Sequence, residues 1–74
     1  MNKIIKLSNL KANKKCIVYS IDECQKNYFQ NLGIIKNEIV EIIFITCNYY
    51  GIVIDNSLLY LSTKDVDKIF VKEL

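Results

Sequence analysis

Apolar and polar residues alternate along several short segments of this chain, and this alternation predicts β-strands. The first predicted strand is Cys16–Ile21, with Ile17 and Tyr19 on one side and Val18 on the other. A longer strand is predicted from Glu38 to Thr46, where both sides are largely apolar, so the pattern leaves the inward side open. A strand that is apolar on both sides is typical of a barrel or a sandwich, or it carries an interaction surface.

The second half of the chain predicts a hairpin and a closing strand. Gly51–Ile54 and Leu58–Leu61 are apolar runs joined by Asp55-Asn56, a residue pair that favours the positive φ of a two-residue turn. Ser62 then predicts the cap of one short helical turn. Ile69 and Val71 are predicted to form the closing strand.

One helix is predicted, over Asp22–Gly33. Asp22 is a suitable N-cap, and Gln25 three residues later is placed for a capping box. Gly33 follows the last apolar residue, where a left-handed conformation is cheapest without a Cβ. Residues spaced by three and four predict one face that packs on a sheet: Cys24, Tyr28 or Phe29, and Leu32.

Asparagines mark the remaining turns, since Asn tolerates the left-handed conformation. Leu7 and Leu10 are apolar anchors before a reversal at Asn13, and Asn37 and Asn56 mark two later structural turns. Together the elements predict a mainly β fold, a small SH3-like barrel of about five strands with one short helix between strands 1 and 2. We expect the edge strands of such a barrel to close on each other.

Length and composition indicate which class of protein this chain belongs to. The 74 residues are 51% hydrophobic with no Pro and two Gly, which predicts one folded domain over residues 1–74. No apolar run is long enough to span a bilayer, and Lys3 and Lys6 interrupt the N-terminus where a signal peptide would be apolar. We therefore expect a cytoplasmic protein that is not embedded in a membrane.

The chain has few of the residues that usually bind metal ions or act as acid–base catalysts. It has no His, and its cysteines, Cys16, Cys24 and Cys47, form no CxxC motif, so we expect no metal, no cofactor and no disulfide. Cys16 and Cys24 are expected to be small buried residues. No nucleophile lies beside a base, so no catalytic residue is assigned and an enzyme is not expected.

Charge is unevenly distributed. The net charge is +2, all ten cations are Lys, and five of them precede the first acid, Asp22. Such a lobe can meet an acidic partner or a nucleotide phosphate, or it is simply a solvated surface. The absence of Arg argues against nucleic acid, which we do not expect as a partner. A small nucleic-acid-binding barrel stays open as an alternative, with stacking tyrosines beside lysine: Tyr19, Tyr49, Tyr50 and Tyr60.

The order and spacing of these anchors resemble the FeoA family, the small cytosolic accessory proteins of bacterial ferrous-iron uptake. The matching positions, from Leu7 to Val71, are Leu7, Leu10, Ala12-Asn13, Leu32-Gly33-Ile34, Lys36-Asn37, Asn56, Leu61-Ser62, Val66 and Ile69-Phe70-Val71. Three family glycines are replaced by Asn, so each turn can survive. The family's Arg after the last Leu is Ser62 here, and its prolines are absent.

The resemblance implies a non-enzymatic adaptor or regulator that binds the cytosolic GTP-binding part of the iron transporter. A second class is a stand-alone SH3-like domain related to the C-terminal part of metal-dependent repressors. The sequence does not identify the surface that binds a partner. A weak homo-oligomer is also compatible with it.

An adaptor surface should use apolar residues that the core does not need. The candidates are Tyr28 on the helix, Ile35 after Gly33, and Tyr49 and Tyr50 in a predicted loop. Completion of the core is the alternative for Tyr28 and Ile35. Adjacent residues of an extended chain point in opposite directions, so at most one ring of the tyrosine pair can join the core.

Overall fold

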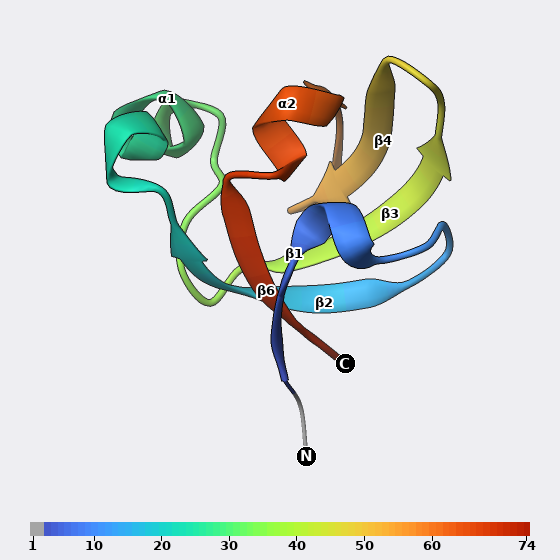
Figure 1. Cartoon of the computed structure of the whole chain (residues 1–74), viewed down its shortest axis with the longest axis horizontal. Helices are drawn as coiled ribbons and strands as arrows, with labels where there is room; N and C mark the ends of the chain where they lie inside the picture. The colour runs from blue at the N-terminus through green and yellow to red at the C-terminus, as the bar shows by residue number, and fades with distance from the viewer. Residues whose placement is uncertain (1–2) are drawn as a thin grey trace.

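The computed structural model describes residues 3–74, which form one antiparallel sheet that curls around the core (Figure 1). The strands of this part of the chain are β1 (Ile4–Lys6), β2 (Lys15–Ile21), β3 (Ile39–Ile45), β4 (Tyr49–Ile54), β5 (Ser57–Ser62) and β6 (Ile69–Glu73). Their order in the sheet is β1-β6-β2-β3-β4-β5. The predicted mainly β, SH3-like fold is confirmed.

The structure has one strand more than predicted. β1 pairs with β6, with Ile5 opposite Val71, and three residues are too few for alternation to reveal a strand. The helix therefore lies between the second and third strands. The sheet also ends at β1 and β5, which are not neighbours in it, so the expected closure of the edges on each other is not observed.

Within residues 3–74, four short helical segments connect strands of the sheet. They are η1 (Leu7–Asn9), η2 (Glu23–Gln25), α1 (Lys26–Asn31) and α2 (Thr63–Val66). Ser62 caps α2 as predicted, because its Oγ accepts a hydrogen bond from the Asp65 N–H at 3.1 Å.

The predicted helix over Asp22–Gly33 is present but divided into η2 and α1. The Asp22 carboxylate accepts from the Cys24 N–H at 3.0 Å, as an N-cap should. The capping box does not form, because the Asp22 N–H donates to the Lys68 carbonyl at 2.9 Å instead. Gln25 ends η2 and stands at the N-cap position of α1, where its side chain makes no capping hydrogen bond.

The predicted turns have the predicted backbone. Asn13, Asn37 and Asn56 have φ values of 68°, 76° and 64°, and Gly33 has a φ of 88°. Each lies in the left-handed region, where Asn and Gly are favoured.

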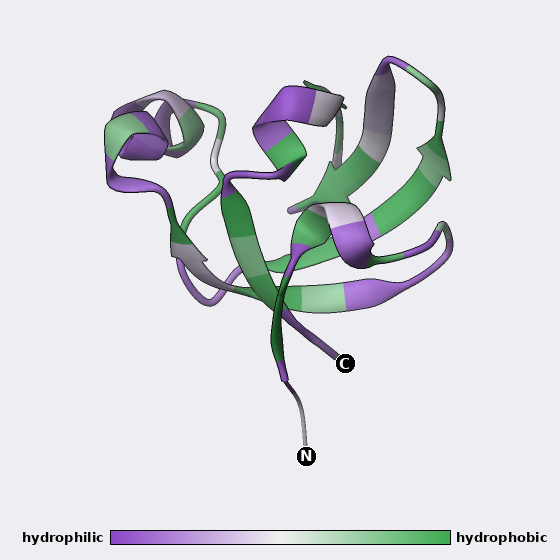
Figure 2. Cartoon of the chain, in the orientation of Figure 1, coloured by the Kyte–Doolittle hydropathy of each residue, from purple (hydrophilic) through white to green (hydrophobic). Residues whose placement is uncertain are grey.

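The core lies on the concave side of the sheet, and hydrophobic residues recur along β3 and β6 (Figure 2). On β3 the inward residues are Val40 and Ile42, whereas Ile39 is 53% exposed. Other fully buried side chains come from helices, strands and turns: Leu7, Cys16, Val18, Phe29, Ile34, Ile52, Leu61, Val66, Ile69 and Val71.

The cysteines differ from the prediction in one respect. Cys16 is buried as expected, and its Sγ lies 3.6 Å from the Val40 carbonyl oxygen. Burial, and secondarily the charge of Glu73, raises the pKa of this thiol to about 11. The expectation that Cys24 is buried was wrong, because Phe29 alone occupies the inner face of this short helix.

Candidate functional site

A groove of about 360 Å³ lies between the end of β2 and helix α1. Its walls come from three consecutive segments, which contribute Tyr19, Ser20 and Ile21; Glu23, Lys26 and Gln30; and Ile34, Ile35 and Lys36. Ile34 is buried beneath the groove, while Ile35 on its rim is 45% exposed. The groove thus combines an apolar floor with polar side chains at its edge.

A bulge in β2 sets the position of Tyr19. The pairing of β2 with β6 shifts register between Val18 and Ser20, leaving Tyr19 without an opposite residue. Bulges re-aim a side chain at the rim of a sheet, and the Tyr19 ring here is 39% exposed beside the groove. Alternation alone placed Tyr19 with Ile17 and Ile21, so the sequence did not indicate this displacement.

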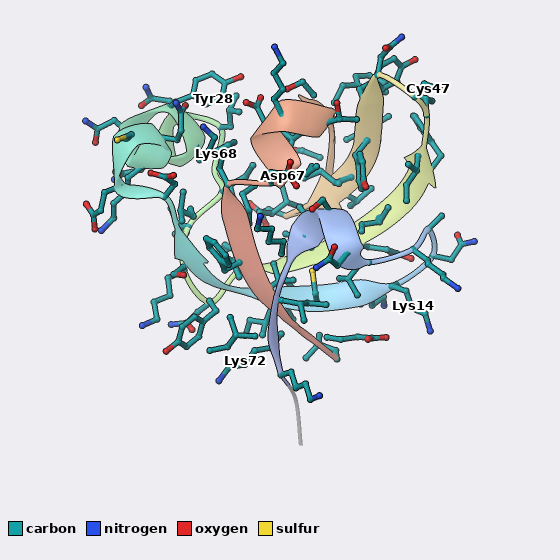
Figure 3. All side chains as sticks on the ribbon, in the orientation of Figure 1. Lys14, Tyr28, Cys47, Asp67, Lys68 and Lys72 are labelled. Atoms are coloured by element: carbon teal, nitrogen blue, oxygen red, sulfur yellow. The ribbon has the colours of Figure 1, made fainter. Side chains whose placement is uncertain are left out.

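Two lysines approach the Tyr19 ring from distant parts of the chain. The Nζ of Lys72 lies 4.8 Å from the ring centroid, and the Nζ of Lys36 lies 5.4 Å from it. These distances are within the range of cation–π attraction. Lys72 belongs to β6 (Figure 3), so only the pairing of β6 with β2 brings it to Tyr19.

The electrostatics of the groove are mainly positive. Lys26 and Lys36 line it and Lys72 adjoins it, whereas Glu23 is the one acid among its lining residues. Ammonium groups on a partly apolar rim favour a ligand that offers carboxylates together with an apolar side chain. The arrangement suits the binding of such a ligand.

The candidate residues Ile35 and Tyr28 occupy different surfaces. Ile35 lines the groove, but Tyr28 does not, since Lys26 and Gln30 form the groove-facing side of α1. Tyr28 is 49% exposed and its ring packs edge-on to Phe29 at 5.1 Å. The alternative that these two residues complete the core was wrong, because both are exposed.

The tyrosine pair is divided between the core and the surface. Tyr49 and Tyr50 begin strand β4, so their assignment to a loop was wrong. Tyr50 is 7% exposed, and its hydroxyl donates to the Ser8 carbonyl at 3.1 Å. Tyr49 is 41% exposed. The prediction that at most one ring joins the core is confirmed.

Tyr49 belongs to an aromatic cluster on the outer face of the sheet, formed by Phe44, Tyr49 and Tyr60. The ring centroids of Tyr49 and Tyr60 are 5.5 Å apart, and Phe44 lies 6.2 Å from Tyr49 and 5.9 Å from Tyr60. Phe44 lies over Gly51, where a Cβ would overlap its ring. None of these three rings is among the residues that line the groove, so the groove and this cluster are separate surfaces.

Within residues 3–74 no three His, Cys, Asp or Glu side chains are grouped so as to hold a metal ion. In the same part of the chain, no helix has the length and apolar character needed to cross a bilayer.

Comparisons with known proteins agree on the fold. The model of the FeoA domain family matches residues 5–73. Among solved structures, an iron uptake regulatory protein (FeoA) superposes with a TM-score of 0.87 at 13% identity, covering 97% of this chain and all of that chain. An FeoA-like protein from Clostridium acetobutylicum superposes with a TM-score of 0.90 at 19% identity. That alignment covers 100% of this chain and 91% of the other.

A manganese-dependent transcriptional repressor also resembles this chain, with a TM-score of 0.89 at 16% identity. The alignment covers the whole of this chain but only 44% of the repressor. No curated protein matches. At such identities the structural likenesses establish a shared fold.

Proposed function

This chain belongs to the FeoA domain family, whose members are linked to ferrous-iron uptake, and on that premise we propose that it is a non-enzymatic adaptor of this uptake system. In this proposal it binds the cytosolic GTP-binding part of the iron transporter. The observation that carries the proposal is the groove beside α1, which presents apolar and cationic side chains together.

The contact is expected to centre on Ile35. Its side chain is apolar, 45% exposed and flanked by Lys36, so it can anchor a partner's apolar residue while the lysines attract acidic groups around it. Tyr19 adds an aromatic ring to the lining of the groove. A segment with an apolar residue between carboxylates fits this surface.

Titration calorimetry with the purified GTP-binding domain of the transporter tests the proposal. Ile35→Lys should weaken binding by about 1 to 2 kcal/mol, roughly tenfold in the dissociation constant. Because Ile35 is a surface residue, the substitution should change the free energy of unfolding of the protein by no more than about 0.5 kcal/mol. Lys36→Glu should also weaken binding, and added salt should reduce the difference between it and the parent chain.

Ile45→Lys is the matched control. Ile45 is apolar and 40% exposed, ends strand β3, and is not among the residues that line the groove. The Ile45→Lys variant should bind the transporter domain with the same affinity as the parent chain. Normal binding by Ile35→Lys and Lys36→Glu would exclude the groove, and no binding by the parent chain would exclude the transporter domain as the partner.

A second candidate is binding of single-stranded nucleic acid, which the two lysines beside the Tyr19 ring favour, because a base could stack there while the ammonium groups meet phosphates. Fluorescence titration with an oligonucleotide at increasing salt is the measurement. Salt-sensitive binding that Tyr19→Ala abolishes would support this function over the adaptor.

A further inference from the structure

Strand β5 forms an open edge of the sheet. It pairs with β4 on one side, and no strand of residues 3–74 lies on the other. The turn residues Asp55 and Asn56 both have positive φ, and Ile54 is opposite Ser57 directly beside them. In such a two-residue hairpin the residues flanking the turn are hydrogen bonded to each other, and bonded and non-bonded pairs then alternate.

This alternation identifies the backbone groups that β4 does not use. Leu59 and Leu61 follow Ser57 in pairing with β4, so Leu58 and Tyr60 direct their N–H and C=O groups away from the sheet. Neither takes part in a backbone hydrogen bond outside the strand ladders of residues 3–74. Their side chains are exposed too, Leu58 at 51% and Tyr60 at 61%.

The usual protection against edge pairing is missing from β5. Natural edge strands carry charges or proline, or are very short. The six residues of Ser57–Ser62 include no charge and no proline. The opposite edge, β1, is half as long, is preceded by Lys3 and ends in Lys6, so it would repel a second copy of itself. The two edges of one sheet therefore differ in their capacity to pair.

We propose that two copies of this chain associate by antiparallel pairing of their β5 strands about a two-fold axis at Leu59. Leu58 of each copy then lies opposite Tyr60 of the other, and each such pair exchanges its free N–H and C=O groups. A neutral strand meets its own copy without opposing or burying a charge. The inner faces of both sheets stay on the same side, which extends the sheet across the two copies.

The register centred on Leu59 uses the edge better than its nearest alternative. Centring the axis on Tyr60 would place Leu58 opposite Ser62, the N-cap of α2, whose carbonyl is needed for the first hydrogen bond of that helix. Centring on Leu59 instead matches an aliphatic with an aromatic side chain on the outer face, a favourable cross-strand pair. Tyr60 is already buttressed by Phe44 and Tyr49, so little side-chain freedom is lost on association.

Sedimentation equilibrium of the full chain over a wide concentration range tests this pairing. The parent chain should form a reversible dimer. Leu58→Lys and Tyr60→Glu should each raise the dimer dissociation constant about tenfold or more, because each disrupts both copies of the Leu58–Tyr60 pair. Mixing the two variants should restore dimers, since the mixed dimer keeps one original pair and gains one pair of opposite charges.

Circular dichroism melts verify that the variants remain folded, as their exposure predicts. Ile39→Lys is the matched control, at 53% exposure on β3, and should dimerise normally. A parent chain that is monomeric at every concentration would overturn the proposal, even if its β5 edge became protected on adding the transporter domain. Dimers that resist both β5 substitutions, or mixed variants that remain monomeric, would also overturn it. This inference is independent of the transport partner.

Discussion

The two faces of strand β4 show how differently neighbouring aromatic residues are used in this small domain. On the inner face, Tyr50 is 7% exposed and its hydroxyl is hydrogen bonded to the Ser8 carbonyl. On the outer face, Tyr49 is 41% exposed and contacts the rings of Phe44 and Tyr60. Both residues have the same side chain and adjacent positions, yet one holds η1 to the sheet and the other belongs to a surface cluster.

The difference shows that the outer face is organised although it is not a core. A single glycine makes room for the cluster, because the missing side chain of Gly51 lets the Phe44 ring approach the strand closely. The register shift between Ile42 and Phe44 places Phe44 opposite Gly51. The outer face thus has specific packing, but each residue there should contribute less to stability than its neighbour inside.

The largest expected effect is at Tyr50. Tyr50→Ala should lower the free energy of unfolding by about 3 to 5 kcal/mol, as for other large aromatic residues removed from a core. Tyr49→Ala should lower the free energy of unfolding by only about 1 kcal/mol or less, which is the contribution expected of exposed aromatic contacts. Urea denaturation of both variants measures the contrast. Equal costs would show that the two faces are not energetically distinct.

Tyr50→Phe serves as the control for this pair, because it keeps the ring and removes only the hydroxyl. It should cost about 1 kcal/mol, the net value of one hydrogen bond.

A smaller effect is expected at Gly51. Gly51→Ala should destabilise by about 1 to 3 kcal/mol, because the new methyl group displaces the Phe44 ring from the outer face. Gly51 does not have a left-handed backbone, so the cost should come from this contact alone. In a Phe44→Ala background the same substitution should be nearly neutral, and a double-mutant cycle by thermal denaturation measures the coupling. An unchanged cost in that background would exclude the contact as its cause.

The smallest effect concerns the cysteines, which also divide between inside and outside. Cys24 and Cys47 are exposed and should react with iodoacetamide in the native protein at about pH 8, whereas Cys16 should react only after unfolding. Mass spectrometry of the alkylated protein counts the modified residues. Three rapid modifications under native conditions would contradict the burial of Cys16.

The raised pKa of Cys16 also predicts a pH dependence. Its thiol ionises near 9.0 when unfolded but at about 11 in the fold. The unfolded state therefore loses this proton first, and the free energy of unfolding should fall as the pH rises from 9.0 toward 11. Cys16→Ala should lack this part of the decline.

The sequence by itself determined the features that depend on one residue and its immediate neighbours. Asn13, Asn37, Asn56 and Gly33 are each found at positive φ, because few other residues adopt that backbone cheaply. Alternation located the main strands, and Ser62 the start of α2, for the same local reason. The resemblance to the FeoA family rested on the same local features, because the family's sequence pattern consists of these turns and the apolar residues between them.

Only the tertiary structure decided which residues meet and which side of a strand is buried. β3 is apolar on both sides, so its inner face followed from the bulge and from pairing with β4. The displacement of Tyr19, the approach of Lys72 to its ring, and the division between Tyr49 and Tyr50 depend on partners tens of residues away. The open edge at β5 is a property of the whole sheet, because no segment can encode locally whether another strand will cover it.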